Sequence, residues 1–385
     1  MRIAFISGNR SSWGGSEVLW SQAALRLRAM RHDVMASVHG LPATPRQIAE
    51  LRDADIIVRE RRMNFGRRSE RLRHLLVSKA QKSPLVEPLP SQDRRDLEKF
   101  RPDLVCLSQG GTACALEWME YCLTARIPYI VVSQANAEWL WPQDAKAERL
   151  SRAHAGALVT CFVSQRNLIL FETQIAAKLP NSRVVWNPFQ ISYEAAPLWP
   201  EAVVGWKLAC VGRLSMTKGQ DLILQVLADP LWKDRPISIS FFGSGPIEHS
   251  LRRLSCMLGV EDKVVFQGHV DSVESIWAGH HALLMPSRCE GLPLALVEAM
   301  LCGRSAIVTD VAGNTEVLDD NRTGFVAAAP TRPLVAEAME RAWQRRAEWR
   351  EMGQAAAASI RQQVPRDPVG DFAGLLLSAA GQRSS

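Results

Sequence analysis

The chain has 385 residues, of which 47% are hydrophobic and 22% are charged. This balance is typical of folded globular proteins and excludes a disordered chain, and the length favours two domains over one or three. No apolar run approaches the roughly 18 residues that a membrane-spanning helix requires, so the sequence predicts no transmembrane segment.

The net charge of +6 is unevenly distributed along the chain. Residues 1–100 contain 19 Lys and Arg against 11 Asp and Glu, whereas the remainder contains 27 against 29. Such an excess suits a phosphate-bearing acceptor or an anionic membrane surface, although a solvated helix face would look the same. Nucleic acid is disfavoured, because no aromatic residues alternate with the arginines and no nucleic-acid-binding motif is present. The excess peaks in a basic segment that contains Arg59, Arg61, Arg62, Arg67, Arg68, Arg71 and Arg73.

The eight cysteines show no spacing of a zinc or redox motif, and several lie inside apolar runs, where a thiol packs as a small hydrophobic group. We therefore expect neither a disulfide framework nor a metal cluster. The amino-terminal apolar run, residues 1–7, is too short for a secretion signal. A cytoplasmic location is expected, and the basic segment leaves open a peripheral contact with the inner membrane face.

Short apolar runs rich in β-branched residues alternate with stretches of helical apolar spacing along the first half of the chain. Helical spacing is clearest over residues 18–30 and 113–123. Strands are predicted at residues 3–6, 34–38, 56–58, 104–107, 129–132, 161–163 and 184–186.

The alternation pauses over residues 187–206, which contain three prolines, and then resumes. Alternating strands and crossover helices are typical of a doubly wound parallel sheet. We therefore expect two Rossmann-like α/β domains facing a cleft, residues 1–195 and 196–365, with a hinge near residue 195 and a last helix within 366–385 that returns to the first domain. Strands of the second half are predicted at residues 208–211, 237–242, 264–266, 282–285, 306–309 and 325–327.

Ligands of such domains bind at the carboxyl ends of the strands, in loops that lead into helices. The loop after the first predicted strand contains Gly14 and Gly15, which would let the backbone approach an anion closely. It does not match the G-x-G-x-x-G dinucleotide motif. A simple glycine turn before a helix capped by Ser16 is the alternative.

Two further loops follow strands in the second half. Arg213 and Lys218 are flanked by glycines, and together they can neutralise a departing diphosphate, which lowers the barrier to breaking its bond. Two surface cations in a turn are the alternative. The loop with Gly243 and Gly245 is compatible with a close ligand approach or with a turn.

The most informative segment, residues 286–303, runs from the end of a predicted strand through a glycine loop into a helix. Pro293 suits the first helical turn, and Gly303 suits the helix end. Glu290 precedes the helix and Glu298 lies within it, so we expect them to contact one ligand at two places. Free N–H groups at residues 291–294 would face phosphate or sugar oxygens at the positive end of the helix.

Glu298 lies on a helix that is apolar on most sides. Burying an unpaired carboxylate costs several kcal/mol, so we expect a hydrogen-bonding partner such as a ribose diol. A partner within the protein is the alternative.

The ordered set of motifs resembles the family 4 retaining glycosyltransferases, which have the two-domain GT-B fold. The most specific part is the E-x7-E segment from Glu290 to Glu298, and Gly212 to Gly219 match the family pattern G-R-x(4)-K-G. The resemblance extends over nearly the whole chain. Its other parts are Gly14-Gly15, residues 243–246, residues 264–268, residues 313–316 and residues 323–325.

The resemblance implies a role for each matching residue. Arg213 and Lys218 would hold the donor diphosphate, Glu298 the ribose hydroxyls and Glu290 the hydroxyls of the transferred sugar. It also implies that no divalent metal or other cofactor is needed. Further donor contacts are implied for Gly14, Gly15, Gly243, Gly245, Gly291, Leu292 and Leu294.

One departure concerns the segment after the strand at 129–132, where many family members carry a histidine near the sugar. Here Gln134 and Asn136 are present instead; each can hydrogen-bond a sugar hydroxyl, but neither can act as a general base at neutral pH. Trp139 and Trp141 suggest an apolar acceptor platform, with ordinary core packing as the alternative.

The sequence thus predicts a retaining glycosyltransferase that moves a sugar from a UDP- or GDP-sugar donor to a hydroxyl of a glycan, lipid-linked or small-molecule acceptor. A non-catalytic scaffold that binds nucleotide sugars, and an epimerase or phosphorylase of similar fold, are the alternatives. A hydride-transferring dehydrogenase agrees least with the sequence, because the dinucleotide motif is missing.

Overall fold

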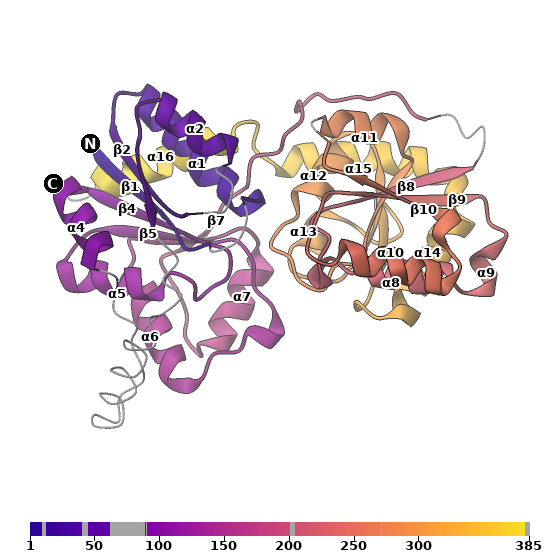
Figure 1. Cartoon of the computed structure of the whole chain (residues 1–385), viewed down its shortest axis with the longest axis horizontal. Coiled ribbons are helices and arrows are strands. Elements are labelled where there is room, and N and C mark those ends of the chain that lie inside the picture. Colours follow the sequence, from indigo (N-terminus) through magenta and orange to yellow (C-terminus); the bar gives the residue numbers. More distant parts are fainter. Residues whose placement is uncertain are drawn as a thin grey trace. The chain divides into compact units, whose positions relative to one another are not determined.

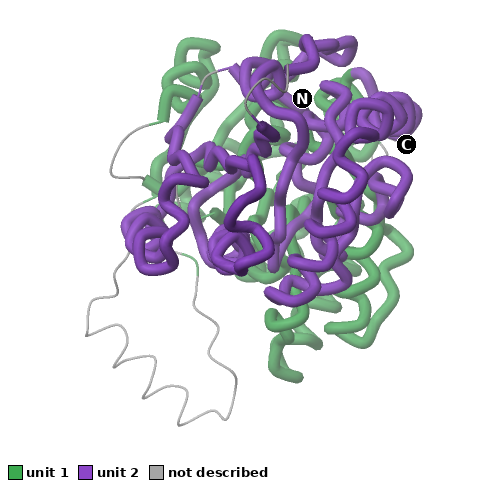
Figure 2. Tube along the Cα trace, turned by 90° about the vertical axis from the view of Figure 1, so that its right-hand side faces the viewer, with its two compact units in different colours: residues 1–188, 367–385 green, residues 189–366 purple. Residues whose placement is uncertain are grey.

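The computed structural model describes residues 1–9, 13–40, 45–61, 89, 91–200, 205–270 and 272–381. These residues form two compact units: unit 1 comprises residues 1–188 and 367–385, and unit 2 comprises residues 189–366 (Figure 2). Of the basic segment, Arg59 and Arg61 lie in a strand of unit 1, and the remaining five arginines lie outside the described residues.

Unit 1 is built on a seven-stranded parallel sheet with the strand order β3-β2-β1-β4-β5-β6-β7 (Figure 1). Residues alternate between its two faces, so Ile3 and Phe5 belong to one apolar cluster and Ala4 and Ile6 to another. All seven strands predicted for the first half exist, although the last begins and ends two residues earlier than the predicted 184–186. They are β1 (Arg2–Ser7), β2 (Asp33–His39), β3 (Ile57–Arg61), β4 (Leu104–Gln109), β5 (Tyr129–Ser133), β6 (Val159–Phe162) and β7 (Ser182–Val184).

Helices cover both faces of this sheet, which explains why its inner strands are apolar on both sides. The last helix, α16 (Pro368–Gly381), packs against α1 (Gly15–Ala29), with Phe372 and Leu376 in the same cluster as Leu27. Asp367 forms an ion pair with Arg26 of α1. The other helical segments are α2 (Arg46–Asp53), α4 (Ser91–Phe100), α5 (Leu116–Ala125), η1 (Glu138–Leu140), α6 (Asp144–Ala155) and α7 (Gln165–Gln174).

Unit 2 is built on a six-stranded parallel sheet with the order β10-β9-β8-β11-β12-β13. The six strands predicted for the second half are confirmed, and so is the fold class of two Rossmann-like α/β domains. The strands are β8 (Trp206–Val211), β9 (Ile237–Phe242), β10 (Val264–Gly268), β11 (Ala282–Met285), β12 (Ser305–Thr309) and β13 (Gly324–Ala327). The helices are α8 (Gln220–Leu227), α9 (Pro230–Lys233), α10 (Glu248–Leu258), α11 (Val273–Gly279), α12 (Leu294–Leu301), α13 (Asn314–Val317), α14 (Arg332–Gln344) and α15 (Trp349–Gln363), with 3-10 turns η2 (Met216–Lys218), η3 (Glu261–Lys263) and η4 (Arg346–Glu348).

Two arginines hold the proline-containing stretch after Phe189 to unit 2. The buried Arg304 guanidinium donates to the carbonyls of Leu198 and Trp277, and Arg361 donates to those of Tyr193 and Ala195 at 3.0 Å. Burial lowers the pKa of Arg304 to about 10. These hydrogen bonds to backbone carbonyls therefore attach the first residues of unit 2 to the rest of that unit. The sequence had indicated only a break in the strand pattern at this place.

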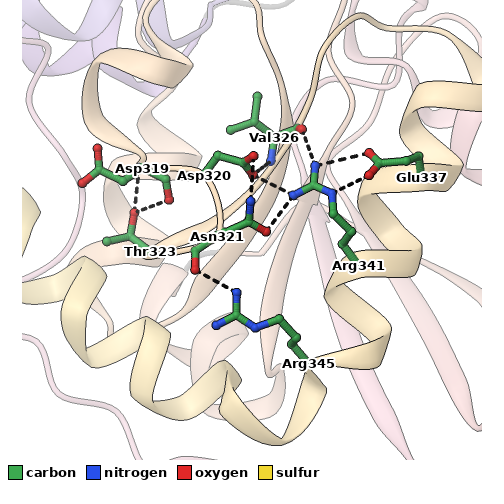
Figure 3. A network of polar contacts seen from close by, with 8 residues as sticks. All are labelled: Asp319, Asp320, Asn321, Thr323, Val326, Glu337, Arg341 and Arg345. Carbon is green, nitrogen blue, oxygen red and sulfur yellow. Dashed lines mark hydrogen bonds and ion pairs between the residues drawn. The ribbon is translucent and has the colours of Figure 1, made fainter.

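The turn that leads into β13 is fixed by a polar network on α14 (Figure 3). Arg341 donates to Asp320 Oδ1 and Asn321 Oδ1 at 2.9 Å and to the Val326 carbonyl at 2.8 Å, and it forms an ion pair with Glu337. These contacts keep the edge strand in register with the sheet.

Within the described part of the chain, no helix is both long and apolar enough to cross a membrane.

Candidate active site

The predicted ligand-binding loops of unit 2 lie together, because β9, β8 and β11 are neighbouring parallel strands whose carboxyl ends share one edge. Backbone hydrogen bonds connect these loops directly. Leu214 N donates to Ser244 O at 3.1 Å, and Arg288 N donates to Thr217 O at 2.7 Å. The structure thus gathers the loops that carry Arg213, the two glycines at 243 and 245, and Glu290, although these loops are far apart in sequence.

Lys218 and Glu290 form an ion pair at the centre of this edge. The distance from Lys218 Nζ to Glu290 Oε1 is 2.5 Å, and the side chains are 22% and 6% exposed. At such low exposure the attraction between the two charges is much stronger than between surface charges. Arg213 lies on the same loop, at its exposed side. Two residues predicted to contact different parts of one ligand therefore contact each other.

A second ion pair, which the sequence interpretation missed, braces the same loops. Arg288 binds Asp221 through two hydrogen bonds of 2.7 Å, and it also donates to the Met216 carbonyl at 2.8 Å. This bidentate geometry fixes the direction of the guanidinium as well as its position. The only sequence signal was the position of both residues beside the predicted motifs, which does not reveal a pairing across 67 residues.

The glycines of these loops allow close backbone packing. A Cβ on Gly243, whose φ is +116°, would lie 2.3 Å from the Gly212 carbonyl oxygen. A Cβ on Gly245 would lie 2.1 Å from the Leu214 oxygen, and one on Gly219 would lie 2.0 Å from the Pro286 oxygen. Contacts this short are not possible for real side chains. Gly243 and Gly245, predicted as donor contacts, are thus required for the packing of one loop on another.

Gly245→Ala is expected to destabilise unit 2 by about 1–3 kcal/mol, because the new methyl group must displace the Leu214 backbone. Calorimetry should show a melting temperature lower by about 2–4 °C per kcal/mol. Gly279→Ala is the matched control, since a Cβ there meets no atom within 4 Å. Equal melting temperatures for the two variants would contradict the packing role.

Glu298 lies in α12, which Pro293 precedes at the N-cap position and Gly303, with φ +70°, terminates. The predicted position of Pro293 inside the first turn is therefore wrong by one residue. The Glu298 side chain is 5% exposed, and its Oε1 accepts a hydrogen bond of 2.8 Å from the Gln190 backbone N–H. Burial raises the pKa of Glu298 to about 7, and the Gln190 hydrogen bond partly offsets this effect. The expected partner exists, but it belongs to the protein.

The remaining predicted donor contacts of unit 2 lie directly before α12. Gly291 and Leu292 are buried in the loop that follows Glu290, and Leu294 is the half-buried first residue of the helix. The Gly291 carbonyl accepts from Gly313 N at 2.9 Å, which attaches this loop to the segment after β12. The start of α12 is therefore held from two sides, by the loop after β8 and by the loop after β12.

In unit 1, the segment after β5 holds Gln134 and Asn136, both buried. Asn136 donates to Gln174 Oε1 at 2.8 Å and accepts from Ala137 N at 2.9 Å, so its side chain serves the local fold. Gln134 Oε1 accepts from Asn187 at 2.7 Å, whereas its Nε2 has no hydrogen-bond partner among the described residues. Gln134, one of the two residues predicted to contact the sugar, therefore has an Nε2 donor that no described residue uses.

Gly14 and Gly15 begin α1 and are exposed. The N-cap is Gly14, without a side-chain hydrogen bond, so the alternative in which Ser16 caps this helix is wrong.

Trp139 and Trp141 are 54% and 60% exposed, and core packing is therefore wrong for both. Among the described residues, no group of three or more His, Cys, Asp or Glu side chains is arranged to hold a metal ion.

The two sheets and their crossover helices define the GT-B fold. Over 98% of this chain, the structure is similar to Anabaena HepE in complex with UDP, at 17% sequence identity and a TM-score of 0.73, covering 100% of that chain. The lipopolysaccharide outer core galactosyltransferase WaaB is similar over 98% of this chain and 99% of its own, at 17% identity and a TM-score of 0.67.

Sequence similarity is concentrated in unit 2. Residues 206–345 match the family described as glycosyl transferases group 1. Alpha-D-kanosaminyltransferase of Streptomyces kanamyceticus is 28% identical over 133 residues, 34% of each chain. A GDP-mannose-dependent alpha-(1-6)-phosphatidylinositol monomannoside mannosyltransferase of Mycobacterium tuberculosis is 32% identical over 143 residues, 34% of this chain and 37% of that protein. The chain thus matches about a third of the length of these curated relatives.

Proposed function

We propose that this protein is a retaining glycosyltransferase that moves a sugar from a UDP- or GDP-sugar to a hydroxyl of a glycan, lipid-linked or small-molecule acceptor. The observation that carries the proposal is the Lys218–Glu290 pair at the carboxyl edge of β8 and β11. It lies inside the segment that matches the glycosyl transferases group 1 family. The names of the relatives support a nucleotide-sugar donor, since HepE was solved with UDP and the mannosyltransferase is GDP-mannose-dependent.

In this proposal, donor binding replaces the Lys218–Glu290 contact. The ammonium of Lys218, together with Arg213, binds the donor diphosphate and stabilises the charge that develops as it leaves. The Glu290 carboxylate then accepts hydrogen bonds from hydroxyls of the transferred sugar. Glu298 accepts hydrogen bonds from the ribose hydroxyls, which adds a ligand partner to the Gln190 N–H that it already has.

The transfer breaks the bond between the anomeric carbon and the donor phosphate oxygen, and it forms a bond from that carbon to the acceptor oxygen. The acceptor proton passes to the departing phosphate oxygen, which yields a nucleoside diphosphate. This route needs no side-chain base, in agreement with Gln134 and Asn136 after β5. Two cations at the diphosphate also take the role of a divalent metal, so we propose turnover without one.

A thermal-shift panel of UDP, GDP, ADP and dTDP tests the donor site. A nucleotide at 100 times its Kd should stabilise the protein by about 2.7 kcal/mol, and Glu298→Ala should remove that stabilisation. The sugar nucleotide of the stabilising base is then supplied with acceptors, and NMR of the product reports the anomeric configuration, with and without EDTA.

Three results would count against the proposal. Stabilisation by none of the nucleotides contradicts the donor site, and an inverted product contradicts retention. Binding of a nucleotide sugar without hydrolysis or transfer would favour the non-catalytic scaffold, the alternative that the missing histidine after β5 supports.

A further inference from the structure

An exposed aromatic segment follows β5 in unit 1. Trp139, Leu140 and Trp141 are 54%, 44% and 60% exposed, whereas Trp20 and Trp349 are each 1% exposed. A tryptophan carries the largest apolar surface of any side chain, and exposed groups of this kind mark binding sites more often than chance. Neither ring of this segment stacks on another aromatic ring or on a cation within the described residues.

The segment is held rigidly at its start. Asn136 Nδ2 donates to Gln174 Oε1 at 2.8 Å, Gln174 Nε2 donates to the Ala137 carbonyl at 2.9 Å, and the Ala137 N–H donates to Asn136 Oδ1 at 2.9 Å. Asn136 and Gln174 are 2% and 3% exposed, so this network is shielded from water. Leu140 N donates to the Ala137 carbonyl at 3.0 Å and closes the η1 turn. The rings are therefore presented by fixed backbone, which lowers the entropic cost of binding.

The segment also lies at the ligand edge of unit 1. Gln109 Nε2 at the end of β4 donates to Ser133 Oγ at the end of β5, at 2.9 Å, and Gly8 N donates to the Ser108 carbonyl at 2.6 Å. The loops after β1, β4 and β5 are thus joined at the carboxyl ends of the strands, where ligands of doubly wound domains bind.

The charges beside the rings distinguish between classes of ligand. Exposed carboxylates flank them, Glu138 before Trp139 and Asp144 after Trp141, and neither forms an ion pair with a described residue. Of the four exposed charged side chains over residues 138–148, three are carboxylates and one is Lys146, so this stretch disfavours an anionic membrane surface. A neutral sugar offers an apolar ring face for the indoles and hydroxyl donors for the carboxylates, which accept hydrogen bonds only.

We infer that residues 138–144 form a carbohydrate subsite in which Trp139 and Trp141 stack on sugar rings of the acceptor, while Glu138 and Asp144 accept from its hydroxyls. The assignment of this sugar as the acceptor depends on the proposed function. The subsite specifies a neutral, polyhydroxylated acceptor, because its indole rings contact apolar sugar faces and its carboxylates accept from hydroxyls.

Fluorine NMR of protein labelled with 5-fluorotryptophan tests the subsite, with Trp139→Phe and Trp141→Phe used to assign the two resonances. The probes are maltotetraose, chitotetraose and mannotetraose, and vesicles of phosphatidylcholine with phosphatidylglycerol. At least one oligosaccharide should shift both resonances without shifting that of the buried Trp349. The Trp139→Ala/Trp141→Ala variant should weaken its binding at least tenfold, whereas Met257→Ala, which removes another exposed apolar side chain, should not.

The subsite is overturned if no oligosaccharide shifts these resonances, or if the vesicles shift them and the oligosaccharides do not. The melting temperature of the unliganded double alanine variant serves as the folding control and is expected to equal that of the wild type, because both rings are exposed. Failure of all nucleotides to stabilise the wild type would contradict the proposed function alone, since oligosaccharide binding is measured without a donor.

Discussion

Glu298→Gln is expected to make the free protein more stable at pH 8 and to weaken nucleotide binding at least tenfold. The wild-type carboxyl has a folded pKa of about 7, above its ordinary value of 4.5, because it is buried. Between pH 4.5 and about 7 the unfolded chain ionises this group and the folded chain keeps it largely protonated. Wild-type stability is therefore lost progressively as the pH rises from 4.5 to about 7, by about 3 kcal/mol in total.

The glutamine variant escapes this loss, since it is neutral at every pH and its side-chain oxygen can still accept from the Gln190 N–H. Thermal unfolding at pH 4.5 and pH 8 should therefore show nearly equal stability at the lower pH and a more stable variant at the higher. Ribose hydroxyls bind a carboxylate more strongly than an amide, so the variant loses nucleotide affinity. A variant that is less stable than the wild type at pH 8 would contradict the conclusion that burial raises the pKa of Glu298.

Lys218→Met is expected to lower the transfer rate by about 100- to 1000-fold, the usual effect of removing one group that stabilises developing charge. It should also destabilise unit 2 by about 3 kcal/mol, because the 6%-exposed Glu290 carboxylate loses its 2.5 Å contact with the Lys218 ammonium. The rate is measured as nucleoside diphosphate release at saturating donor, and the stability by calorimetry.

The double variant Lys218→Met/Glu290→Gln separates the two effects. Removing both charges should recover most of the lost stability, since the buried carboxylate charge is removed together with the ammonium that faces it, while the transfer rate stays low. Arg322→Met is the control: this arginine pairs with Asp319 through side chains that are 72% and 50% exposed, and its loss should change neither property appreciably. If Lys218→Met alone keeps a rate within twofold of the wild type, the proposed role of Lys218 is wrong.

The fold was largely predictable from local patterns. Most inner strands are short apolar runs buried on both faces, as in Ile3 to Ile6, and this pattern needs no tertiary information to be recognised. The same patterns place the loops after β8, β9 and β11, and therefore the approximate site, because ligand-binding loops follow strands in such sheets. The misplacement of Pro293 by one residue shows the limit of local signals at helix ends.

The sequence by itself thus determined the strands, the two sheets and the loops that carry Arg213, Lys218, Glu290 and Glu298. Only the tertiary structure decided which of these side chains meet, since Lys218 and Glu290 are 72 residues apart and Glu298 and its Gln190 partner 108. The sequence also left open whether Trp139 is buried or exposed, because the same sequence pattern is found for core residues and for residues of a surface platform. Burial and pairing depend on distant segments, and these come together only when the chain is folded.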